Sequence, residues 1–81
     1  MRAFEVRIDE IYVPSDRRKE LESARVEEVA EEILSEAEQR PIQVRKGKDR
    51  YVLVKGIHRL EARRSLGEET IEAYIVAARR A

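Results

Sequence analysis

The sequence contains no cysteine, and this absence removes one large class of chemistry. Without a thiol, the chain cannot form disulfides, bind a metal through thiolates or carry out thiol-based redox reactions. Asparagine and tryptophan are also missing, and three tyrosines and one phenylalanine are the only aromatic residues. The absence of asparagine, together with 42% charged residues, favours a thermophilic source.

Long hydrophobic runs are missing as well. No stretch of the sequence is long and apolar enough to cross a bilayer, and the N-terminus lacks the pattern of a signal peptide. We therefore expect a cytoplasmic protein that makes no contact with a membrane. The 81 residues suffice for one small domain, 1–81, and leave no room for a second hydrophobic core.

Charge is balanced overall but unevenly distributed along the chain. Lys and Arg number 17, as do Asp and Glu, so we expect no strong global field that would attract nucleic acid. Residues 20–38 contain eight acids and one base, whereas residues 40–64 contain nine bases and two acids. An acidic helix followed by a basic second half is compatible with an anionic ligand on one face.

Periodic apolar residues predict the first two elements. In residues 4–13, Phe4 and Val6 alternate with charged residues, as in a strand with one buried face, and we expect Phe4 in the core. Residues 26–37 repeat apolar side chains every three or four positions, as an amphipathic helix does. Ser23 precedes this stripe and is the expected N-cap of the helix.

The second half of the sequence predicts two strands, a helix and a final strand. The two strands flank a glycine-containing turn at residues 46–49. The helix follows Gly56, and Gly67 suits the left-handed cap at its C-terminal end. Residues 70–76 alternate as a last strand. The predicted order is β-α-β-β-α-β, which belongs to the α+β class.

The junction between the third strand and the second helix has the composition of an anion site. The first turn of a helix has backbone N–H groups without intrahelical partners, and the helix dipole is positive there. Gly56 lets an anion approach closely, and His58 and Arg59 supply side-chain donors, with Lys55 adding charge. The residues alone leave a second interpretation open, in which an ordinary turn carries a surface histidine and a solvated arginine.

Other charged clusters are weaker candidates. Arg17 and Arg18 follow the first strand and can reach the glycine turn only if the helices pack on one side of the sheet. A general base or metal ligand would come from Glu27, Glu28 or Glu31, although a solvated helix face is the favoured interpretation of these residues. Direct contact with nucleic-acid phosphates would use Arg45, Lys46, Lys48 and Arg50. Zero net charge and few exposed aromatic candidates count against that as the main role.

Several segments, taken together, resemble a known family. They are "IYVPSDRR", "RPIQVR", "RYVLVKGIHRLEARRSLG" and "TIEAYIV", separated by the amphipathic helix. This succession resembles the ParB/sulfiredoxin superfamily, in particular its ParB N-terminal (ParB-like nuclease) domain, over nearly the whole chain. The resemblance implies a small domain with a mixed sheet and two main helices.

The resemblance also implies a nucleotide site at the glycine turn. ParB proteins bind CTP there and sulfiredoxins bind ATP, so the expected cofactor is CTP, ATP or ADP, with or without Mg²⁺. Matched residue by residue, the implied phosphate ligands are Gly56, Ile57, His58 and Arg59, with Lys55 beside them. Arg17 and Arg18 match arginines that approach the nucleotide or couple its binding to DNA engagement.

Two departures from the family pattern narrow the function. Ile57 stands where sulfiredoxins have their catalytic cysteine, so thiol-based reduction of sulfinic acid is excluded. The chain also lacks the helix-turn-helix and dimerisation regions of ParB partition proteins, so we expect a stand-alone or truncated member that acts in DNA partition or regulation through a partner. A phosphotransferase or nuclease-type enzyme on the same turn, and a direct DNA-binding module, remain the alternatives.

Overall fold

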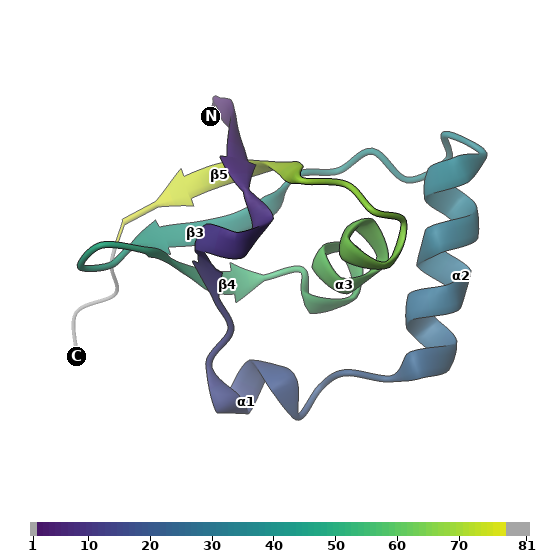
Figure 1. The fold of residues 1–81 in the computed structure, drawn as a ribbon, viewed down its shortest axis with the longest axis horizontal. Coiled ribbons are helices and arrows are strands. Elements are labelled where there is room, and N and C mark those ends of the chain that lie inside the picture. The colour runs from purple at the N-terminus through teal and green to yellow at the C-terminus, as the bar shows by residue number, and fades with distance from the viewer. Residues whose placement is uncertain (1, 78–81) are drawn as a thin grey trace.

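The computed structural model describes residues 2–77, which form one sheet of five strands and three α-helices (Figure 1). The strands are β1 (Ala3–Arg7), β2 (Ile11–Tyr12), β3 (Ile42–Lys46), β4 (Tyr51–Lys55) and β5 (Thr70–Val76), and the helices are α1 (Ser15–Arg18), α2 (Ser23–Leu34) and α3 (Ile57–Ser65). The strand order is β1-β5-β3-β4-β2, with parallel and antiparallel neighbours. This confirms the predicted α+β class with a mixed sheet and two main helices. None of the helices within residues 2–77 is long and apolar enough to span a membrane.

The prediction of one continuous strand over residues 4–13 is wrong, because a 3₁₀ turn at Ile8–Glu10 divides it into β1 and β2. Ile8 and Ile11 are both buried, and their spacing of three would place them on opposite faces of a strand. In a 3₁₀ turn, by contrast, residues three apart lie in line and can enter the same core.

The sheet is strongly curled, which follows from the positions of β1 and β2 at its opposite edges. In a flat sheet, four strand spacings would separate these edges by about 19 Å. The four residue steps from Arg7 to Ile11 span at most about 14 Å. The two edges must therefore approach each other, and this curvature closes the core around one face of the sheet.

Phe4 lies outside the core, contrary to the prediction. It stands opposite Ala73 in the β1–β5 register, yet it is 44% exposed, whereas Val6 of the same strand is buried. β1 forms an edge of the sheet, so no further strand covers its outer end. The guanidinium of Arg2 lies 5.5 Å from the centre of the Phe4 ring and shields part of it.

Helix α3 forms a middle layer between the sheet and α2 (Figure 1). Its Ile57 and Leu60 join the large core cluster of the sheet, and Ala62 packs with Val29 and Ile33 of α2. The helices therefore lie on one side of the sheet, and the predicted apolar stripe of α2 faces α3.

The ends of α2 differ from the predicted ends in two respects. Ser23 is the first helical residue and Glu22 is the N-cap, so the predicted cap is wrong by one position. At the other end the helix stops at Leu34, which is 71% exposed, whereas the predicted stripe continues to residue 37.

Candidate functional site

Gly56 connects β4 directly to α3 through a left-handed backbone conformation, with φ of 111° and ψ of 35°. Residues with a side chain rarely adopt this conformation. A Cβ at this position would also lie only 2.6 Å from Cγ2 of Ile42. Both backbone geometry and packing therefore require glycine at this junction.

The start of α3 presents backbone donors beside this glycine. The first helical hydrogen bond runs from the N–H of Leu60 to the carbonyl oxygen of Gly56, at 2.9 Å. The N–H groups of Ile57, His58 and Arg59 precede that bond and so have no partner within the helix. They supply a positive helix end of the kind that binds anions.

A cavity of about 260 Å³ opens at this turn. It is lined by Lys55, Gly56, Ile57, His58 and Arg59 of the turn and by Glu20, Arg25, Val29, Glu38 and Arg40 of other segments. The structure thus brings all five predicted turn residues together in one cavity. Cationic side chains outnumber the two carboxylates in the lining, which suits an anionic ligand.

His58 ties the start of α3 to the start of α2. Its Nε2 accepts a hydrogen bond from the backbone N–H of Glu22, at 3.1 Å. A neutral ring in this geometry carries its proton on Nδ1, because Nε2 is the acceptor. This contact satisfies the N-cap donor of α2 and places the first turn of that helix, with Arg25, beside the cavity.

Arg59 is half-buried and anchors the beginning of β3. Its Nη1 donates to the carbonyl oxygens of Arg40, at 3.2 Å, and Pro41. Burial lowers the pKa of Arg59, the charge of Arg40 lowers it further, and the carboxylate of Glu38 opposes both effects. A guanidinium has five N–H donors, so an anion in the cavity can bind to those that face it. Such an anion would stabilise the charged form of Arg59, which burial and the charge of Arg40 disfavour.

Glu38 is the one buried charged residue among residues 2–77, with 7% of its surface exposed. Its carboxylate accepts hydrogen bonds from the backbone N–H of Arg40, at 2.9 Å, and from Nε and Nη2 of the same residue, the latter at 2.7 Å. The side-chain bonds from Arg40 lower the pKa of Glu38 to about 2, against the opposing effect of burial. Glu38 therefore serves as a fixed carboxylate beside the cavity and is poorly suited to accept a proton.

Arg25, Glu38 and Arg40 are residues of the cavity that the sequence analysis does not select. Arg25 has one detectable signal, since it is the only base within the acidic segment 20–38. Glu38 and Arg40 lie in the connection between α2 and β3, where no periodic pattern marks them. Their pairing becomes visible only when the chain folds.

The two predicted arginines of the first loop lie outside this cavity. Arg17 forms an ion pair with Glu20, at 3.2 Å, and Glu20 in turn lines the cavity. Arg18 lies in a separate groove with Tyr12 and Arg64. Neither arginine lines the cavity at Gly56, although Ile57 of the turn also lines the groove that holds Arg18.

The predicted carboxylates of α2 also lie elsewhere. Glu28 and Glu31 line a shallow depression on the outer side of the helix, and Glu28 is 3.7 Å from Nη1 of Arg25. Neither these residues nor Glu27 lines the cavity at Gly56. In the part of the chain that the structure describes, no three His, Asp or Glu residues are grouped so as to hold a metal ion.

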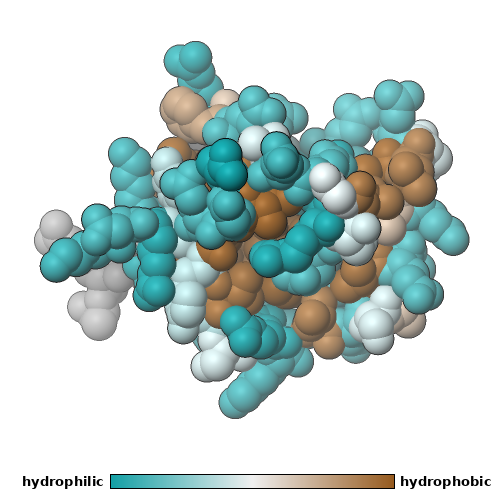
Figure 2. Space-filling view, viewed as in Figure 1, coloured by the Kyte–Doolittle hydropathy of each residue, from teal (hydrophilic) through white to brown (hydrophobic). Residues whose placement is uncertain are grey.

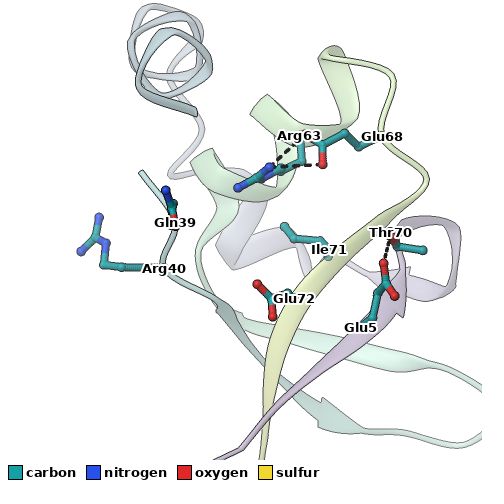
Figure 3. A pocket seen from close by; sticks show the side chains of 8 residues that line it. All are labelled: Glu5, Gln39, Arg40, Arg63, Glu68, Thr70, Ile71 and Glu72. Carbon is teal, nitrogen blue, oxygen red and sulfur yellow. Dashed lines mark hydrogen bonds and ion pairs between the residues drawn. The ribbon is translucent and has the colours of Figure 1, made fainter. Parts of the chain in front are cut away.

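A second cavity, of about 350 Å³, shares Arg40 with the cavity at Gly56 (Figure 3). Its lining comprises Glu5, Gln39, Arg40, Arg63, Glu68, Thr70, Ile71 and Glu72. Arg63 is engaged by Glu68 at 3.0 Å, and Glu5 accepts a hydrogen bond from the hydroxyl of Thr70 at 2.7 Å. Three carboxylates outnumber two arginines in this lining, which disfavours phosphate.

The model of the ParB N-terminal domain family matches residues 2–81. Among solved structures, sulfiredoxin from Arabidopsis thaliana superposes with a TM-score of 0.82 at 28% identity, covering 96% of this chain and 88% of that chain. The C-terminally truncated chromosome-partitioning protein ParB from Caulobacter crescentus, complexed with CTP-gamma-S, has a TM-score of 0.81 at 20% identity, covering 98% and 46% of the two chains.

A variant of a free serine kinase in complex with ADP has a TM-score of 0.79 at 20% identity, covering 94% of this chain and 31% of the kinase. The chain thus spans less than half of the length of the ParB and kinase structures. Similarity at 20% identity shows a shared fold. The comparison with curated proteins found no match. The family match over residues 2–81 shows that the chain belongs to the ParB N-terminal domain family.

Proposed function

We propose that the cavity at Gly56 binds the phosphate groups of a nucleotide. The observation that carries this proposal is the open start of α3 behind a left-handed glycine, in a cavity that also receives Arg25, Lys55 and Arg59. Cations beside a positive helix end do not stabilise the helix, because the dipole there favours negative charge. An anion bound in the cavity would account for these cations, because it would attract both them and the helix end.

The roles of the residues follow from their geometry. The backbone N–H groups at the start of α3 donate to phosphate oxygens, and Gly56 lets the phosphate approach the backbone. Arg25 contributes a side-chain donor from α2, and Arg59 contributes the N–H groups that do not bind the start of β3. His58 holds the two helices in position through Glu22.

Solved relatives support the choice of a nucleotide as the ligand. The similar ParB structure contains CTP-gamma-S, and the similar kinase variant contains ADP. The ligand of this chain would be CTP, ATP or ADP, and membership of the ParB N-terminal domain family supports a role in DNA partition or its regulation through a partner. The carboxylates that the sequence suggests for phosphoryl transfer, Glu27, Glu28 and Glu31, lie away from the cavity, so we propose binding rather than transfer by these residues.

The test is an NMR titration of the ¹⁵N-labelled chain with CTP, ATP, ADP and GTP, each with and without Mg²⁺. We expect the amide signals of Gly56 to Arg59 to shift in a saturable manner with at least one nucleotide. Amides of Ala3 to Glu5 in β1, none of which lines the cavity, serve as an internal control. If every nucleotide leaves the Gly56 to Arg59 signals in place, the proposal fails.

A further inference from the structure

A charged stripe of α2 runs beside the apolar stripe that packs on α3. Residues three, four and seven positions apart lie on the same side of a helix, so Arg25, Glu28 and Glu32 form one line. The adjoining apolar stripe, which includes Val29, packs on α3. Figure 2 shows hydrophilic side chains along the right-hand margin of the molecule, over the outer side of α2. Arg25 therefore lies between this charged surface and the cavity at Gly56, which it lines.

Two carboxylates of the stripe attract Arg25 without forming a hydrogen bond. Nη1 of Arg25 lies 3.7 Å from Oε2 of Glu28 and 3.9 Å from Oε1 of Glu32. Both distances exceed the length of a hydrogen bond, so neither carboxylate fixes the position of the guanidinium. Arg40 offers a contrast within the same cavity, because its Nη2 donates to Glu38 at 2.7 Å. Arg25 is therefore held more loosely than Arg40.

The carboxylate of Glu32 has an acceptor atom that needs a donor. Its Oε1 is buried and accepts no hydrogen bond from any residue that the structure describes. A buried acceptor without a donor raises the free energy of the folded state. A shift of the Arg25 guanidinium by about 1 Å would bring Nη1 within hydrogen-bond distance of this atom. Glu28 exerts a weaker attraction, because its side chain is 66% exposed and water screens its charge.

We propose that Glu32 competes with the bound anion for the guanidinium of Arg25 and thereby lowers the affinity of the cavity at Gly56. When the cavity is empty, Arg25 moves towards Glu32 and satisfies its buried oxygen. When phosphate enters, Arg25 turns to the phosphate oxygens, and its interaction with Glu32 is lost. The loss of this interaction reduces the net free energy of binding. The inference rests on the proposed binding of phosphate groups at Gly56 and identifies a residue that sets the strength of that binding.

Two other roles for Glu32 predict different results. A carboxylate that positions an arginine for a ligand forms hydrogen bonds with it, as Glu38 does with Arg40, and the distance to Glu32 is too long for such a bond. A positioning role would also make binding weaker when Glu32 is replaced. Simple repulsion between Glu32 and phosphate would weaken binding as well, but it would act whether or not Arg25 is present.

The first experiment measures the affinities of CTP, ADP and inorganic pyrophosphate by isothermal titration calorimetry at one ionic strength. We expect Glu32→Gln to bind about twofold to fivefold more tightly than wild type, the range that partly exposed ion pairs contribute. Glu28→Gln should give a smaller gain. Glu31→Gln is the matched control, because it removes the same charge from the same helix and Glu31 forms no ion pair within the described residues. It should leave the affinity unchanged.

A double variant shows whether the effect of Glu32 passes through Arg25. In the Arg25→Ala background, Glu32→Gln should leave the affinity unchanged, because the shared donor is absent. Equal gains with and without Arg25 would assign the effect to simple repulsion and overturn the proposal. Weaker binding by Glu32→Gln would also overturn it, because Glu32 would then position Arg25 for the ligand. Circular dichroism melting checks that each variant is folded.

A measurement without ligand separates this inference from the proposed function. The Nε–H signal of Arg25 in a ¹⁵N NMR spectrum should shift in Glu32→Gln and stay in place in Glu31→Gln. If nucleotides bind but Glu32→Gln changes neither this signal nor the affinity, the competition is wrong and the proposed function stands. If wild type and all variants bind none of CTP, ADP and pyrophosphate, the proposed function fails and the competition fails with it.

Discussion

At both ends of α3 a glycine takes a left-handed backbone conformation, with φ of 111° at Gly56 and 81° at Gly67. Arginines also lie near both ends, with Arg59 in the first turn and Arg63 and Arg64 in the last. At the C-terminal end, the positive side chains compensate the negative pole of the helix dipole and stabilise the helix. Arg63 is also paired with Glu68. At the N-terminal end, positive charge adds to the positive pole.

The difference teaches how similar residues can serve stability at one end and binding at the other. At the C-terminal end, the negative pole of the helix and the arginines beside it balance each other within the protein. The N-terminal end has nearby cations, backbone N–H groups without partners in the helix and no acidic residue in its first turn, and the proposed anion would balance this positive charge.

Replacement of each glycine by alanine should give the largest difference between the two ends of α3, measured as loss of unfolding free energy. Gly56→Ala adds a Cβ at 2.6 Å from Cγ2 of Ile42 as well as backbone strain, so we expect a loss of about 3 kcal/mol in unfolding free energy. At Gly67 no atom lies within 4 Å of such a Cβ, so Gly67→Ala should cost only about 1 kcal/mol. Urea denaturation measures both, and equal losses would contradict the contrast.

Removal of single arginines should affect nucleotide binding at one end only. Arg25→Ala removes a charged donor from the cavity at Gly56 and should weaken binding by about 1.5–3 kcal/mol. Arg64→Ala, at the other end of α3, should leave the nucleotide affinity unchanged. Isothermal titration calorimetry with the nucleotide that shifts the Gly56 amide measures both. Similar losses in the two variants would indicate a general charge effect rather than a local site.

Acid titration should reveal the carboxylate beside the N-terminal end. The folded-state pKa of Glu38 is about 2, below the ordinary value of 4.5. A lowered folded-state pKa means that the stabilisation is complete above pH 4.5 and is lost as the pH falls towards 2. We therefore expect the unfolding free energy of wild type to fall more steeply than that of Glu38→Gln over this interval. Urea midpoints measured at several pH values test this, and parallel curves would contradict it.

Some features of the site follow from neighbouring residues and could be predicted. The glycine between an apolar strand and an amphipathic helix defines the Gly56 turn, and the start of a helix brings its own donors. His58 and Arg59 enter the cavity because they occupy that first turn. Their detailed contacts differ from the simple expectation of free phosphate ligands, since each also bonds to a backbone group of a distant segment.

Other features depend on contacts between distant segments and could not be predicted. Alternation indicates which residues of a strand share a face, but not whether the strand lies at an edge of the sheet. The prediction that Phe4 lies in the core is wrong for this reason. Arg25 reaches the cavity because α2 packs on α3, and Arg18 leaves it because α1 follows β2 at the far edge of the sheet. The same packing collects Tyr12 with Arg64, which are 52 positions apart in the chain.

The sequence by itself determined the α+β class, the helix that begins after Gly56 and the absence of thiol chemistry. These depend on local backbone preferences, on the periodicity of apolar residues and on which functional groups are present. The tertiary structure decided which charges meet: Glu38 with Arg40, Arg25 with the Gly56 turn, and Arg18 with the Tyr12 groove. Electrostatic contacts act through space over a few ångströms, and only the folded chain brings these groups within that distance.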